Sequence, residues 1–130
     1  MASLDDSILD TTKKLIGIYP EQTDSDLEII THINSMFFVL QQLGVGPPHG
    51  FSIMDNTSKW SEFIGEDQIH AVKSYMGLRV RLLFDPPPTG PSTEAMERQA
   101  SQMEWRLNIK AEGDAWDAQL MTSLPDTESE

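Results

Sequence analysis

Apolar residues recur every three or four positions through most of the chain, a spacing that predicts a protein built mainly from α-helices. The first stripe predicts a helix that starts with Ser3 as its cap and ends at Gly17. The residues expected on its inner face are Leu4, Ile8, Thr12, Leu15 and Ile16.

A second helix is predicted from Ser25, because Ser25-Asp26-Leu27-Glu28 has the spacing of a capping box. The breakers in residues 44–48 (GVGPP) should end it. Its wide apolar stripe makes it the helix expected to be most buried. The stripe consists of Leu27, Ile30, Ile33, Phe37, Leu40 and Leu43, broadened by Ile29, Met36 and Val39.

The central loop is expected to hold a brief strand over residues 51–54 and a short helix over residues 59–64. Trp60, Phe63 and Ile64 would then form a lid over the core. A third long helix follows, with Ile69, Val72, Met76, Val80 and Leu83 on one face and Tyr75, Leu78 and Leu82 beside them.

The prolines at 86–88 should end the third helix and reverse the chain, because proline lacks the amide donor that a helix needs. A fourth helix is predicted with Met96, Ala100, Met103 and Leu107 on its inner stripe. The predicted fold class is therefore mainly α. It is a small bundle of about four helices, with a short extra helix or strand in the central loop and an acidic C-terminal tail.

The chain of 130 residues is expected to form a single domain, and it is strongly acidic. It carries 9 basic and 21 acidic residues, which gives a net charge of −12. Residues 111–130 hold six acids and no base, so the body (1–110) and the tail (111–130) each carry −6. Such acidity disfavours binding to nucleic-acid phosphates or anionic membranes. No apolar run is long enough for a membrane span, and the chain is expected to be soluble and untargeted.

Catalytic and metal-binding motifs are absent from the sequence. Cysteine is missing, and no two of His32, His49 and His70 have the i, i+4 spacing of a helical metal site. There is no nucleophile signature and no phosphate-binding glycine loop. We therefore expect no catalytic residue, no metal and no cofactor, and no enzyme activity.

Two sets of aromatic and apolar residues are candidates for protein contacts. Trp105 lies off the inner stripe of the fourth helix, beside Arg106, and tryptophan and arginine are enriched at interfaces. The tail interrupts its acids with large apolar residues, which predicts a docking segment rather than a solvated end. These tail residues are Trp116, Leu120, Met121 and Leu124.

Four short segments stand out when the chain is considered as a whole: INS at 33–35, QLGVG at 42–46, RLLFDPP at 81–87 and EWRL at 104–107. They are the most specific pieces of a pattern over residues 5–111 that resembles the phage head–tail connector family, the adaptor or head-completion proteins of tailed bacteriophages.

The resemblance implies a structural subunit that is made in the host cytoplasm and resides in the virion. It implies a homo-oligomeric ring, expected to be a dodecamer, beneath the portal protein and above a tail-proximal connector or tail protein. Double-stranded DNA would pass through its lumen without sequence-specific binding, and a like-charged lumen suits such passage.

Two other interpretations stay open from the residues alone. One is a small acidic helical interaction module of non-viral origin, which binds a basic partner through its tail. The other is a hydrolase that pairs an Asp or Glu with His32 or His70, for which the sequence offers no motif. Neighbouring genes for portal, capsid and tail proteins would favour the connector over the host module.

Overall fold

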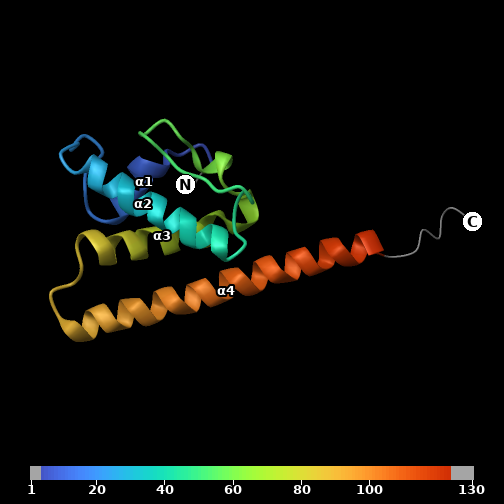
Figure 1. The fold of residues 1–130 in the computed structure, drawn as a ribbon. Coiled ribbons are helices and arrows are strands. Elements are labelled where there is room, and N and C mark those ends of the chain that lie inside the picture. The colour runs from blue at the N-terminus through green and yellow to red at the C-terminus, as the bar shows by residue number, and fades with distance from the viewer. Residues whose placement is uncertain (1–3, 124–130) are drawn as a thin grey trace, which may run out of the picture.

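The computed structural model describes residues 4–123, with side chains to residue 120, and within this range it is mainly helical (Figure 1). This confirms the predicted helical bundle. Its α-helices are α1 (Ile8–Leu15), α2 (Asp26–Gln42), α3 (Ile69–Phe84) and α4 (Gly90–Ser123), and two short 3-10 helices, η1 (Trp60–Glu62) and η2 (Glu66–Gln68), precede α3.

Helix α3 is the centre of the molecule. It packs against α1, α2 and α4, and Figure 1 shows it as the layer between α2 and α4. Seven of its residues are buried, compared with four in α2. The expectation that α2 is the most buried helix was therefore wrong, because α3 is covered on more sides.

The core beneath α2 is aromatic, and Phe37 lies at its centre. The Phe37 ring centroid lies 4.5 Å from that of Phe63, 5.1 Å from that of Phe51 and 6.4 Å from that of Trp60. Trp60 is fully buried, so it belongs to the core itself rather than to a lid over it. A β-carbon at Gly46 would lie 2.3 Å from the Phe63 ring, which explains why glycine occupies this turn at φ +88°.

The first helix begins later than predicted. Its cap is Ser7, whose Oγ accepts a hydrogen bond from the Asp10 amide at 3.2 Å. The preceding segment lies along residues 58–61 instead: the amides of Trp60 and Ser61 donate to the carbonyls of Asp6 and Leu4. That pairing holds residues 4–7 out of a helix, so α1 begins about one turn later than predicted, and Ser3 itself lies outside the described residues. Gly17 does end the helix, at φ +87°.

A buried lysine replaces the capping box predicted for α2. The helix starts at Asp26 as expected, but the Ser25 side chain makes no cap hydrogen bond. The Asp26 carboxylate instead lies 2.7 Å from Nζ of Lys13, which is 1% exposed and also donates to the carbonyls of Pro20 and Gln22. A buried ammonium requires such complete pairing. The Lys13 side chain thereby fixes the loop between α1 and α2.

The strand predicted at 51–54 is not present among the described residues. The backbone there is irregular, and Asn34 takes the place of a partner strand. Its side-chain oxygen accepts from the Ile53 amide at 2.8 Å, and its side-chain nitrogen donates to the Ile53 carbonyl at 3.0 Å. The predicted helix at 59–64 is the 3-10 turn η1, so of the two forms expected for the central loop the helix was right.

Several residues assigned to inner stripes lie outside. Leu27 is 80% exposed, and Leu15 and Leu83 are also exposed. Leu15 and Leu83 lie at or near the C-terminal ends of their helices, and Leu27 lies on the exposed side of α2.

Candidate interaction surface

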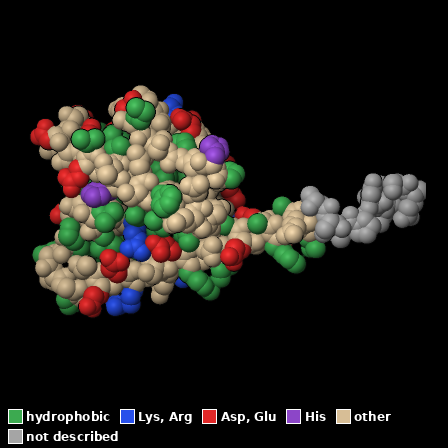
Figure 2. Space-filling model, viewed as in Figure 1, with side chains coloured by type: hydrophobic (Ala, Val, Ile, Leu, Met, Phe, Trp, Pro, Cys, Tyr) green, Lys and Arg blue, Asp and Glu red, His purple; other side chains and the backbone are tan. Residues whose placement is uncertain are grey.

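Helix α4 continues through the boundary predicted between body and tail. Residues 90–111 lie against the rest of the molecule, whereas every residue from 112 to 120 is exposed and the helix projects beyond the body (Figures 1 and 2). No proline follows until Pro125, and an i, i+4 ion pair of 3.2 Å joins Lys110 to Asp114 across the boundary.

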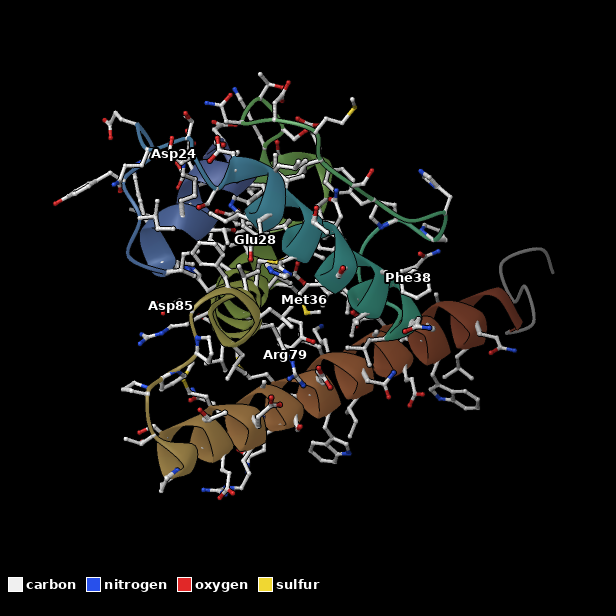
Figure 3. The ribbon with its side chains drawn as sticks, turned by 60° about the vertical axis from the view of Figure 1, so that its left-hand side comes forward. Asp24, Glu28, Met36, Phe38, Arg79 and Asp85 are labelled. Carbon is white, nitrogen blue, oxygen red and sulfur yellow. The ribbon has the colours of Figure 1, made fainter. Side chains whose placement is uncertain are left out.

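A polar cluster fixes α4 on α3. Arg79 extends from α3 to two carboxylates of α4, those of Glu97 and Glu104, each at 2.8 Å (Figure 3). The Tyr75 hydroxyl donates to the same Glu104 carboxylate. Burial and this hydrogen bond raise the pKa of Tyr75 well above its ordinary value.

The hydrogen bonds to Glu104, Tyr75 and Glu97 act on Arg79 as well. Burial alone would lower the pKa of its guanidinium, but these bonds and the charge of Glu104 raise it. Further along α4, the side-chain amide of Asn108 donates to the Leu43 carbonyl at 3.2 Å, which ties the helix to the end of α2. The inner face of α4 is therefore set by specific polar contacts as well as by packing of Ala100 and Leu107.

The outer face of α4 carries four exposed apolar side chains, Trp105, Ile109, Trp116 and Leu120, which we call the α4 stripe. Their spacings of four, seven and four residues place them within about 60° of arc around the helix axis. Trp105 is 65% exposed and Trp116 is 63% exposed. Exposed residues of this size on one line of a helix are typical of a protein contact.

The sequence-predicted interface residues therefore divide. The structure brings Trp105, Trp116 and Leu120 onto one face and adds Ile109, which sequence reasoning missed although its spacing from Trp105 and Trp116 could have revealed it. Arg106 is also exposed, but it lies about 100° around the helix axis from Trp105 and is therefore outside the α4 stripe. The side chain of Met121 and all of Leu124 lie outside the described residues.

Arg106 borders a hollow of about 290 Å³ where α4 meets η2 and the start of α3. Ala71, Met103 and Leu107 form its apolar part, and Asp67 and Lys110 lie at its edge together with Gln68. The mixture of opposite charges at this edge specifies no ligand class.

A second surface, on α2, was not recognised from the sequence. Residues 29–54 contain no Asp, Glu, Lys or Arg, in a chain that is 23% charged. The exposed side of α2 presents Leu27, Thr31, Ser35 and Phe38, which we call the α2 face (Figure 3 labels Phe38). Phe38 is 60% exposed and borders an open hollow of about 640 Å³. The long uncharged run was the available signal.

The histidines remain apart. His49 and His70 are exposed, and half-buried His32 has its Nε2 3.6 Å from Glu28. Among residues 4–123, no group of three His, Asp or Glu side chains is placed to hold a metal ion. None of the helices described is both long and apolar enough to cross a bilayer.

Comparison with protein families gives one decisive result: the phage connector protein family matches residues 8–114. The chain belongs to that family. The match begins at the first residue of α1 and ends within α4, so it includes Trp105 but not Trp116. Comparisons with curated proteins and with solved structures gave no match.

Membership in the phage connector family supports a structural, connector-type role in a bacteriophage particle. It agrees with the resemblance found in residues 5–111 of the sequence. The exposed surfaces of the connector, rather than a cavity, are therefore its candidate functional parts.

Proposed function

We propose that this connector is a subunit of a ring, expected to be twelve-fold, between the portal protein and a tail-proximal connector or tail protein. Family membership supports the connector role. The observation that carries assembly is the α4 stripe, where two tryptophans and two aliphatic residues lie exposed on the side of α4 away from its packed face. Burying each such side chain contributes about 1.5–3 kcal/mol.

The net charge supports the proposed conduit for DNA. A ring of subunits that each carry −12 presents like charge to the phosphates of a passing duplex, so the DNA is not retained by counterion release. The virion is the expected location, and the ring has no catalytic part in this proposal.

Residues 114–124 are proposed to dock on the portal or on an adjacent subunit. Their described part projects from the body, where a neighbouring protein can reach Trp116 and Leu120. Ordering a segment on binding costs about 1–2 kcal/mol of backbone entropy per residue. Helix α4 already holds residues 114–123 in a helix in the isolated chain, which reduces that cost.

The test is attachment of purified subunits to portal-bearing heads. Trp105→Glu places a charge in the α4 stripe and should abolish attachment while the circular dichroism of the subunit stays unchanged. Gln99→Glu is the matched control. Gln99 is also exposed on α4, and the substitution adds the same charge about 120° around the helix axis from Trp105. Normal attachment and tail joining by the Trp105→Glu variant would overturn the proposal.

A further inference from the structure

We infer that the α2 face is the surface that receives the α4 stripe of a second copy of this chain. The inference rests on the proposed ring and names the two faces that would meet in it. It begins from the finding that both helices present a line of exposed, uncharged side chains in a strongly acidic molecule.

Charge restricts where two copies can meet. Each subunit carries −12, so contact between most parts of two surfaces brings carboxylates together. Three of the four residues of the α2 face, Thr31, Ser35 and Phe38, lie in the run from residue 29 to residue 54, which has no Asp, Glu, Lys or Arg. The fourth, Leu27, lies between Asp26 and Glu28 at the charged end of the helix. A like-charged copy therefore approaches this side with the least repulsion.

The α4 stripe cannot serve as its own partner equally well. From residue 111 onward the helix carries Glu112, Asp114 and Asp117 and no base. Glu112 lies about 20° from Trp105 around the helix axis, so two α4 helices packed through their stripes would bring their Glu112 carboxylates together, whereas α2 has no acid after Glu28. The α2 face thus offers apolar contact without that repulsion.

The spacing of large side chains also matches. Leu27 and Phe38 are separated by eleven residues on α2, and Trp105 and Trp116 are separated by eleven on α4. Eleven residues are close to three helical turns, so each pair lies on one line about 16 Å apart. In either direction of packing, one tryptophan lies near Phe38 and its hollow while the other lies near Leu27.

The two faces lie on opposite sides of the molecule. Helix α3 is the layer between α2 and α4, and each of the two faces is the exposed side of its helix (Figures 1 and 3). A contact between different faces of identical subunits is heterologous, and it leaves one face of each type open until a ring closes. Such a contact extends to trimers and larger species rather than stopping at a dimer.

Engineered cysteines test this pairing, because the natural chain has none. We would make full-length Phe38→Cys/Trp105→Cys and Phe38→Cys/Trp116→Cys, with Phe38→Cys/Gln99→Cys as the matched control. After oxidation of concentrated protein and of protein bound to portal-bearing heads, one of the first two should give at least tenfold more disulfide-linked trimers and larger species than the control.

Two results would overturn the pairing: a trimer yield no higher than that of the control, or efficient dimers from Trp105→Cys alone, which would indicate α4 against α4. Because cysteine removes one tryptophan, Phe38→Glu is compared with Met54→Glu in the natural background. Only Phe38→Glu should reduce self-association, with circular dichroism unchanged in both. Failure of the natural chain to attach to portal-bearing heads would instead contradict the proposed function, whatever disulfide-linked species the cysteine variants form.

Discussion

Arg79 of α3 and Glu104 of α4 form a two-bonded ion pair, with Nη2 at 2.8 Å and Nε at 3.1 Å from the same carboxylate oxygen. The pair is only partly exposed, and Tyr75 shares the carboxylate. It lies on the packed side of α4, opposite the α4 stripe. The orientation of the proposed binding face thus depends on this cluster.

Glu104→Ala should therefore destabilise the connector by about 1–3 kcal/mol, because it leaves the buried Tyr75 hydroxyl without its acceptor and leaves Arg79 paired only with exposed Glu97. Urea unfolding measures the change. Glu97→Ala is the control: Glu97 is exposed, and its pair with the same arginine should contribute about 0–1 kcal/mol. If the two substitutions lowered the free energy of unfolding equally, burial of Glu104 would not increase the stabilisation that its ion pair provides.

Tyr75 should give the connector an alkaline sensitivity. Its pKa is raised in the folded chain by burial and by the bond to Glu104, so its contribution is complete below the unfolded value of about 10. Above that pH the unfolded state loses the proton first, and stability falls as pH rises. Tyr75→Phe should show a smaller loss between neutral and strongly alkaline pH; an identical loss in both proteins would contradict the assignment.

Neighbouring phenylalanines on α2 should respond differently to truncation. Phe37→Ala removes a side chain that is 1% exposed and central to the aromatic cluster, and should cost about 3–5 kcal/mol. Phe38→Ala changes an exposed residue and should alter the free energy of unfolding by less than about 0.5 kcal/mol. Similar midpoints for both variants in thermal unfolding would mean that α2 is wrongly oriented.

Two glycines with the same backbone angle separate strain from crowding. Gly17→Ala should cost about 1–2 kcal/mol for its left-handed backbone, since no atom lies near the added carbon. Gly46→Ala has the same strain and must also displace the Phe63 ring, so its cost should be larger. Denaturant unfolding of both variants compares them, and equal costs would show that Phe63 moves aside freely.

The sequence was sufficient for the helices but not for their ends. Periodic residues such as Ile33 and Val72 located α2 and α3, because one face of each had to be buried. Residues 4–7 do not form a helix because their backbone makes hydrogen bonds with residues 58–61. Local spacing does not encode such a long-range pairing. The full burial of Lys13 was likewise unpredictable, because its partners come from a loop and from α2.

The candidate surface was predicted in part. Trp105 could be placed outside because the inner stripe of its helix was already assigned to other residues. The α2 face was missed because Leu27 had been assigned to the inner stripe, whereas it lies on one line with Phe38 on the exposed side of α2. Sequence periodicity identifies which residues share a face, but which face is covered depends on the packing of the other elements.

Hydrogen exchange in residues 114–124 tests the central claim most directly, namely that the projecting end of α4 binds when the connector assembles. Amides in this segment should exchange fast in isolated subunits, because residues 114–120 are exposed on a helix end that projects beyond the body, and such an end opens locally at low free-energy cost. They should exchange slowly in connectors on portal-bearing heads. Equally fast exchange in both states would contradict the claim and leave this segment as a solubilising end.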